Sequence, residues 1–235
     1  MSLLKGTRVT WLGHATVLVE LPNGKNLLID PFIEHNPKYP QGFALPKIDY
    51  VLLTHGHMDH IADAAPVAQK DGATVLAMVE LAGYLAGKGV ASTVGFNLGG
   101  TVQLPGVAVT LVEAKHSTSV EEGGSSVYLG VAAGIVLTIK DGPVLYHAGD
   151  TSVFGDMQLI RELYAPEVAM LPIGDHYTMG PKEAALAIRY LQPQVVLPIH
   201  WGTFPALTGT PQELAKLVSD PKIVALIGPG EALEV

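Results

Sequence analysis

Cysteine is absent from the 235-residue sequence. The chain can therefore form no disulfide and offers no thiolate, so any metal site must be built from imidazole and carboxylate groups. Charged residues are scarce at 15%, and the 14 lysines and arginines form no cluster. Because the formal net charge is −8, the sequence provides no broad phosphate-binding surface, and long nucleic acids are not expected as partners.

Long apolar runs are also missing: no stretch reaches the roughly 18 residues that a transmembrane helix needs. The first 21 residues lack the basic start and unbroken apolar run of a signal peptide. We therefore expect a cytoplasmic protein without a membrane partner. Hydrophobic residues make up 48% of the chain, which is typical of a globular protein, and the length favours one domain over residues 1–235. A homo-oligomer is left open.

Apolar and β-branched segments alternate with turns and then with helical patterns, and this order occurs twice. The first pass predicts strands at 8–12, 16–21, 26–29 and 50–54, beginning as an antiparallel meander, then helices at 62–70 and 79–85 around a strand at 74–77. The second predicts strands at 107–114, 125–131, 135–140, 144–147, 168–171, 195–198 and 223–227, and helices at 157–164, 182–191 and 211–218. Two such passes predict an α/β fold, an αββα sandwich of two mixed sheets packed face to face with helices outside.

The densest chemical signal is Thr54-His55-Gly56-His57-Met58-Asp59-His60, directly after an apolar strand. Alternate residues of an extended segment share a face, so His55 and His57 can approach one ion together. A turn beyond Gly56 can bring Asp59 and His60 towards a second ion. We interpret the run as a metal-binding loop, in preference to a polar loop that is rich in histidine by chance.

This run resembles the H-x-H-x-D-H motif of the metallo-β-lactamase superfamily, whose members are mostly hydrolases with an αββα fold. The resemblance implies three further ligands, a histidine after a later strand, a bridging aspartate and a last histidine near the C-terminus. His116, Asp150 and His200 occur in that order, each after a predicted strand. Taken alone, each also fits a simpler role: an exposed loop histidine, a helix cap and a buried core histidine, respectively.

The family pattern implies which ligands share an ion. One ion would be held by His55, His57 and His116, the other by Asp59, His60 and His200, and Asp150 would bridge them, with Asp59 and Asp150 the catalytic acids. Nothing in the spacing alone fixes that division. Two divalent ions are expected; zinc suits this histidine-rich set, and manganese, iron or nickel could use the same ligands.

The chain as a whole is similar to a bacterial group of largely uncharacterised metal-dependent hydrolases, in the L-ascorbate-6-phosphate lactonase-like branch. The shared segments are Trp11–Ala15, Ile29–Phe32, Thr54–His60, His147–Thr151, Pro172–Asp175, Thr178–Pro181, Pro198–His200 and Thr203–Pro205. His176 stands where asparagine is common in the group, and Trp201-Gly202 where Tyr-Asn is common. Pocket details are therefore expected to differ.

Four further residues are candidates for supporting the metals or touching substrate. The resemblance implies that Asp30 hydrogen-bonds the ligand loop, although it could also simply form a turn. His14 is implied to lie near the metals, or to have a structural role. Asp175 and His176 belong to a loop expected to border the cleft. His147 is expected to be a packed strand residue.

The resulting hypothesis is a hydrolase that uses a metal-activated hydroxide on a small ester, lactone, amide or phosphodiester. Two ions, Asp59, Asp150 and a hydroxide leave a local charge of about +1, so an anionic substrate is acceptable. The alternative is a metal-binding protein of the same fold with a regulatory role and no turnover. A di-iron oxidoreductase is disfavoured, because such relatives usually carry glutamate where His57 stands, together with a flavin domain.

Overall fold

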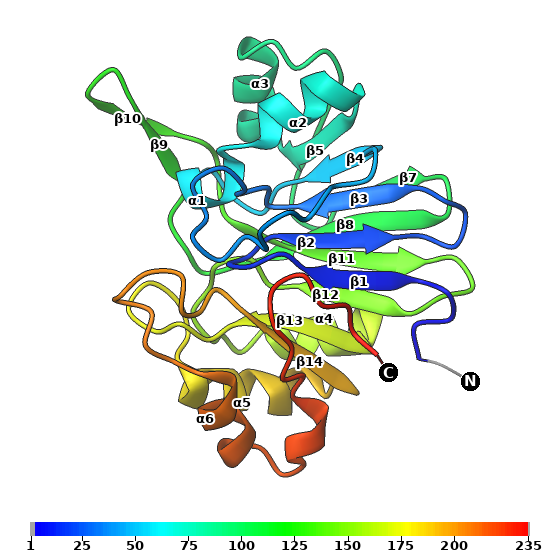
Figure 1. The fold of residues 1–235 in the computed structure, drawn as a ribbon, viewed down its shortest axis with the longest axis vertical. Coiled ribbons are helices and arrows are strands. Elements are labelled where there is room, and N and C mark those ends of the chain that lie inside the picture. Colours follow the sequence, from blue (N-terminus) through cyan, green and yellow to red (C-terminus); the bar gives the residue numbers. More distant parts are fainter. Residues whose placement is uncertain (1–2, 235) are drawn as a thin grey trace.

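The computed structural model describes residues 3–234 and contains two six-stranded sheets packed face to face (Figure 1). The first sheet has the order β1-β2-β3-β4-β5-β6. Its strands are β1 (Arg8–Trp11), β2 (Val17–Glu20), β3 (Asn26–Ile29), β4 (Tyr50–Leu52), β5 (Thr74–Met78) and β6 (Thr93–Phe96). The first three strands are antiparallel, as predicted, and the last three continue parallel to β3.

The second sheet has the order β14-β13-β12-β11-β8-β7. Its strands are β7 (Thr101–Leu104), β8 (Val107–Glu113), β11 (Ala133–Ile139), β12 (Val144–His147), β13 (Val168–Pro172) and β14 (Val195–Ile199). The strands from β7 to β12 pair antiparallel, whereas β12, β13 and β14 are parallel. Both sheets are therefore mixed, and each carries its parallel strands at one end.

Helices cover the outside of both sheets, so the predicted αββα sandwich is confirmed (Figure 1). The short α1 (Met58–Ile61), α2 (Ala64–Asp71) and α3 (Val79–Gly87) lie beside the first sheet. The second sheet carries α4 (Met157–Tyr164), α5 (Pro181–Leu191), α6 (Pro211–Leu217) and a 3-10 turn, η1 (Pro221–Ile223). Among the described residues, no helix has the length and apolarity needed to cross a membrane.

Strand β13 shows how the core is divided between the two layers. Val168 and Met170 belong to the cluster between the sheets, whereas Ala169 and Leu171 belong to the cluster beneath α4, α5 and α6. Successive side chains of a strand point to opposite faces, so a strand buried on both faces is apolar throughout. This explains why its sequence lacks the polar alternation of a half-exposed strand.

Three observed strands were not predicted, and one predicted strand is wrong. Strands β6, β7 and β9 (Ser119–Glu122) have polar or glycine-containing sequences. Residues 223–227 do not form a strand: the Val224 N–H bonds to the Pro221 carbonyl, and only a single bridge joins Val224 to Val196. Residues 125–131 also differ, since β10 (Ser125–Tyr128) pairs with β9 in a separate hairpin that projects from the body (Figure 1).

Candidate metal centre

The predicted ligands lie at one edge of the sandwich, in loops and in the short helix α1, and within each sheet the strands that precede them run in the same direction. Strands β1 and β3 both pair antiparallel with β2, so β1 runs with β3 and β4; likewise, β8 runs with β12 and β14. Ligand sites of open α/β sheets commonly lie beyond the carboxyl ends of such strands. The loops that follow them carry His14, Asp30, the run His55–His60, His116, Asp150 and His200.

Three histidines form the first cluster, which borders the surface. The His55 Nε2 lies 3.0 Å from the His57 Nδ1, and the His116 Nε2 lies 3.3 Å from the same atom. His55 is buried, whereas His57 and His116 are partly exposed. Each residue offers one nitrogen to a common point, which is the arrangement that a divalent cation requires.

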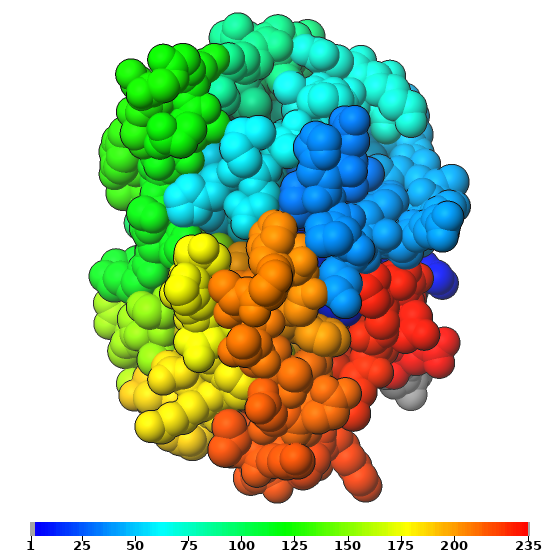
Figure 2. All heavy atoms as spheres, turned by 60° about the vertical axis from the view of Figure 1, so that its left-hand side comes forward, coloured from blue at the N-terminus to red at the C-terminus, as the bar shows by residue number. Residues whose placement is uncertain are grey.

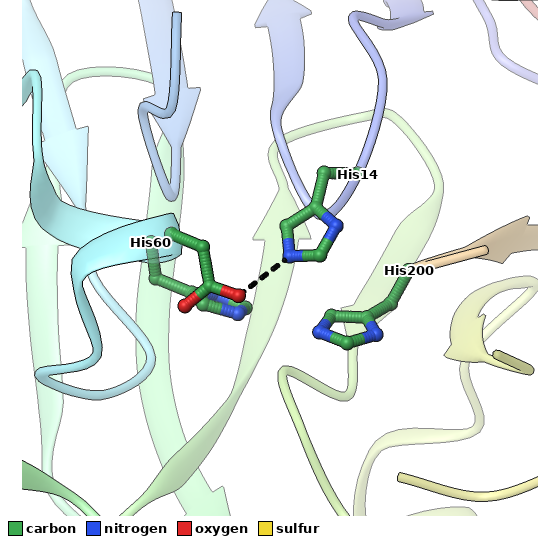
Figure 3. Close-up of side chains that lie close together, drawn as sticks. His14, His60 and His200 are labelled. Atoms are coloured by element: carbon green, nitrogen blue, oxygen red, sulfur yellow. Dashed lines mark hydrogen bonds and ion pairs between the residues drawn. The ribbon is translucent and has the colours of Figure 1, made fainter. Parts of the chain in front are cut away.

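The second cluster is more deeply buried and includes an acid. His14, Asp59, His60 and His200 each offer one ligand atom, and these atoms lie within 4.8 Å of one another. Figure 3 shows the three imidazoles converging from the turn after β1, from α1 and from the end of β14; its dashed line joins the His14 Nε2 to the Asp59 Oδ2, at 3.1 Å. The structure therefore adds His14 to the group predicted from the sequence.

Asp150 lies between the two clusters and approaches nitrogens of both. Its Oδ2 is 3.1 Å from the His200 Nε2, 3.6 Å from the His116 Nε2 and 3.9 Å from the His55 Nε2. Its Oδ1 is 3.4 Å from the His60 Nε2. These four distances place the buried Asp150 carboxylate beside rings of both clusters.

Several polar atoms at this point lack a hydrogen-bond partner within the described residues. They are the Nε2 of His60, the Oδ1 of Asp150 and both ring nitrogens of His200. Leaving a buried polar atom unpaired costs about 1–3 kcal/mol, so these atoms are unfavourable by themselves. Bound cations would satisfy the His60 Nε2, the Asp150 Oδ1 and one nitrogen of the His200 ring, and the donor set of imidazoles and carboxylates suits first-row divalent metals.

Asp30 supports the ligand loop as the sequence predicted. Its Oδ1 accepts a hydrogen bond from the Thr54 backbone N–H at 2.8 Å, and its Oδ2 accepts from the Thr54 hydroxyl at 2.6 Å. The same Oδ2 lies 2.8 Å from the His60 Nδ1. When this nitrogen donates to the carboxylate, the Nε2 lone pair of His60 is left facing Asp150, the tautomer that a metal ligand needs.

The protonation of the first cluster suits metal binding. Burial lowers the pKa of His55 well below its usual value, and the neighbouring His60 lowers it further. Burial likewise lowers the pKa values of His57 and His116. Neutral imidazole is the form that binds a metal, so these three side chains are ready for ligation near neutral pH.

The acids are ionised for different reasons. Burial would raise the pKa of Asp150, but His200 and His60 hold it well below its usual range. Burial also opposes ionisation of Asp59, but the hydrogen bond to His14 and the charges of His60 and His14 together outweigh it, so the Asp59 pKa lies below its usual value. Burial, reinforced by His200, lowers the pKa of His14 to about 4.

Three residues of the centre adopt left-handed backbone conformations. The φ angles are 53° at His14, 46° at Asp30 and 55° at His200. Such angles cost a non-glycine residue about 1–3 kcal/mol and persist only where the surroundings enforce them. Here the His200 N–H donates to the His14 carbonyl at 2.9 Å, which locks two of these turns together. The backbone thus fixes side-chain directions before any ion arrives.

Hydroxyl groups that the sequence did not single out connect the ligand loops. The Thr118 hydroxyl accepts from the Gly56 N–H at 2.9 Å, which ties the loop after β8 to the histidine-rich run. The Thr151 hydroxyl accepts from the Lys115 N–H at 3.0 Å, which ties the His116 loop to Asp150's loop. Their positions beside predicted ligands were the signal that could have identified them.

An open cleft of about 740 Å³ leads to the centre. Figure 2 shows the cyan, yellow and orange segments of the chain meeting on this side of the molecule. The cleft is lined by His57, Asp59, His116, Ser117, Asp150, Tyr177, His200, Phe204, Pro205 and Ala206. The sequence assigned no role to the wall residues Ser117, Tyr177, Phe204, Pro205 and Ala206, although each lies within six residues of a predicted site residue.

Asp175 and His176, predicted to border the cleft, are not among its lining residues. Asp175 instead lines a separate hollow with Pro181 and Lys182. The His176 ring packs edge-on against Tyr177, with ring centroids 4.4 Å apart, and it is Tyr177 that reaches the cleft. His147, predicted as a packed strand residue, is buried, and its Nε2 lies 2.9 Å from the carbonyl oxygen of Ala15.

Comparison with known proteins identifies the family. Residues 25–201 match the model of the β-lactamase superfamily domain. A UPF0173 metal-dependent hydrolase of Herpetosiphon aurantiacus is 48% identical over 97% of this chain and 98% of its own length. One from Koribacter versatilis is 48% identical over 92% of this chain and 93% of its own.

A similar solved structure is also described as a metal-dependent enzyme of this kind. A metallo hydrolase from the hyperthermophilic archaeon Ignicoccus hospitalis is 37% identical, superposes with a TM-score of 0.85, and covers 97% of this chain and 98% of its own. These names do not distinguish the lactonase-like branch, which stays a prediction. The chain belongs to the metallo-β-lactamase superfamily and, within it, to the UPF0173 metal-dependent hydrolases.

Proposed function

We propose that this metal-dependent hydrolase holds two divalent ions and cleaves a small ester, lactone, amide or phosphodiester. His55, His57 and His116 would bind one ion, and Asp59, His60 and His200 the other. The observation that carries the proposal is the position of Asp150, whose two oxygens face nitrogens of both clusters while one of them lacks a hydrogen-bond partner in the described structure.

The chemistry follows from the donor set. When bound, two divalent ions supply a nucleophile from water near neutral pH and polarise the bond under attack. Zinc is the ion that we propose, because imidazole and carboxylate ligands suit it; manganese, iron and nickel are the alternatives.

The protein's own residues prepare this chemistry. Asp59 is the acid of the centre that reaches solvent, with 31% of its side chain exposed to the cleft, so its ionised carboxylate can accept a hydrogen bond from an attacking water. Asp150 is 3% exposed, and its negative charge would offset that of the cations. Asp30, hydrogen-bonded to His60, fixes which nitrogen that ring presents.

Elemental analysis of the purified protein tests the proposal, followed by assays on p-nitrophenyl phosphodiesters, lactones, amides and β-lactams before and after chelation. About two ions per chain and turnover that disappears with chelator and returns with zinc would support it. The variant His57→Ala should lose metal and turnover, whereas His35→Ala, an exposed loop histidine, should lose neither.

Two other outcomes would change the conclusion. Metal without turnover on every substrate class would favour a metal-binding protein with a regulatory role. A protein that takes up no metal even after reconstitution would overturn the proposal.

A further inference from the structure

The cleft has a polar floor and an apolar wall. The floor is formed by the candidate ligands, and the opposite wall by Tyr177, Phe204, Pro205 and Ala206. No lysine or arginine is among the described residues that line it. A substrate therefore meets two carboxylates, several imidazoles and apolar surface, but no cationic side chain.

Two lysines near the centre, Lys115 and Lys182, lie outside the cleft lining, and Lys38 lies on the exposed surface beside Gly202. The ammonium group of Lys115, next to His116, pairs with Glu113 on the exposed surface. Lys182 lines the separate hollow that also contains Asp175. A charged phosphate group would thus depend on the ions alone for neutralisation, whereas phosphate-binding sites of proteins commonly add arginine, lysine or clustered backbone N–H groups.

The Phe204 ring of this wall is held in place. The Phe204 ring centroid lies 5.5 Å from that of His14 and 6.4 Å from that of Phe32, which is buried. The Phe204 carbonyl also accepts from the Leu207 N–H at 2.9 Å, which closes the turn that carries the ring. A ring fixed in this way offers apolar contact at little entropic cost.

The cleft continues on its other side into a hollow of about 410 Å³ that shares His116 and Ser117 with it. Five of the eight residues that line this hollow carry a hydroxyl group, including Ser126 and Tyr128 on the projecting β10. It too has no charged lysine, arginine or acid among its lining residues. Both sides of the centre thus favour an uncharged molecule.

We propose that the natural substrate is uncharged near neutral pH and packs a flat apolar group against Phe204 and Tyr177, as an ester, lactone or amide with an aromatic or alkyl acyl part does. This inference rests on the proposed function. In the reaction, the acyl carbon–oxygen or carbon–nitrogen bond breaks, a bond to the water oxygen forms, and a water proton passes to the leaving alcohol or amine.

Three substrates with one chromophore test the proposal: p-nitrophenyl phenylacetate, p-nitrophenyl acetate and p-nitrophenyl phosphate. We expect kcat/KM to fall in that order, with about tenfold or more between the first two, since burying the phenyl group that distinguishes them contributes roughly 1.5–3 kcal/mol. Phe204→Ala should abolish the preference for phenylacetate over acetate without changing metal content. Leu163→Ala, which removes an exposed side chain of α4 outside the cleft, should preserve it.

Calorimetric titration of the zinc-loaded protein with phenylacetamide and with inorganic phosphate measures the two binding affinities. It therefore tests the same preference without turnover. Tighter binding of phenylacetamide, weakened by Phe204→Ala, supports the inference even if no tested ester is cleaved, in which case only the proposed hydrolytic function fails. A preference for phosphate in binding or turnover, or a phenylacetate preference that survives both Phe204→Ala and Tyr177→Ala, would overturn it.

Discussion

The two clusters of the candidate centre differ in burial and in support. The histidine cluster contains no acid of its own, and His116 has 13% of its side chain exposed. In the second cluster, His14 and His60 are fully buried, His200 is 2% exposed, and Asp59 contributes a negative charge. Two ions bound at these places would therefore experience different surroundings.

The difference extends to the groups that orient the ligands. His60 is held by Asp30, and His14 by the Thr203 hydroxyl, 3.0 Å from its Nδ1. Orienting partners of this kind typically change metal affinity by 10–100-fold. The His57 and His116 rings instead contact His55, each other and Ser117, which lies 3.5 Å from His57. We expect the buried cluster to bind its ion more tightly.

The largest effect is expected from Asp150→Ala, which should remove the difference in metal affinity between the two clusters. Since this carboxylate faces both clusters, we expect loss of both ions and a fall in turnover of about a hundredfold or more, with the fold largely intact because the core lies between the sheets. Metal analysis, circular dichroism and kinetics measure these effects. Asp156→Ala, an exposed acid at the start of α4, is the matched control, and metal retained at the parent level in Asp150→Ala would refute the bridging role.

Asp30→Ala should weaken the buried cluster most, through His60, and also destabilise the protein. It leaves the Thr54 N–H, the Thr54 hydroxyl and the His60 ring without their buried acceptor, so we expect the free energy of unfolding to fall by about 3 kcal/mol. Urea unfolding of the metal-free protein measures this loss. A milder effect is expected from Asp30→Asn, which keeps one acceptor; equal stability of Asp30→Ala and the parent would contradict the assignment.

His14→Asn should lower the affinity of the buried cluster about tenfold and leave the other nearly unchanged. Asparagine tolerates the left-handed backbone at this position, but its shorter side chain cannot reach both Asp59 and Thr203. Competition between the protein and a chromophoric zinc chelator resolves the two affinities. His35→Asn is the control, and an unaltered pair of affinities in His14→Asn would remove His14 from the centre.

The smallest expected effect is a pH dependence of stability and metal binding that arises from the titration of His60. Burial alone would lower its pKa, but Asp150 and Asp30 raise it well above 6.5. Its protonation therefore stabilises the metal-free fold fully below pH 6.5, and this stabilisation is lost as the pH rises through the folded-state pKa. Metal binding displaces that proton, so it strengthens as the pH rises.

The difference in Tm between zinc-loaded and metal-free protein should accordingly widen above pH 6.5. Histidines with lowered pKa values are neutral in both folded forms. The two forms share one unfolded state, so the contribution of these histidines cancels in this difference. Thermal unfolding followed by circular dichroism measures it. A difference that stays constant from pH 6.5 to the pKa region of His60 would argue against the proton displacement.

How far the fold could be predicted depended on burial. The buried strands β8 and β11 to β14 have apolar sequences that identify them locally. Strands β6 and β7 are only partly buried, and β6 contains Gly95, so their segments resemble loops. They become strands because the neighbouring β5 and β8 offer them hydrogen-bonding partners, which is information that a local pattern does not contain.

The candidate ligands could also be predicted from their local sequence. His55, His57, Asp59 and His60 are close in sequence, and each remaining predicted ligand follows an apolar strand, so their types and positions could be read from the chain. The residues of the cleft wall could not be predicted from the sequence. Tyr177 and Phe204 have ordinary sequence surroundings and acquire a role only through the loops that bring them together.

The sequence by itself determined the chemistry on offer: histidine and carboxylate ligands without thiolate, placed after buried strands of an α/β chain. The tertiary structure decided how these ligands divide into two clusters. It brought His14 against Asp59, 45 residues away, and against Thr203, 189 residues away, and it placed Asp150 between two clusters of unequal burial. Strand direction and register set these contacts, and they depend on pairings between distant segments, whereas the identity of a ligand is a property of one residue and its immediate neighbours.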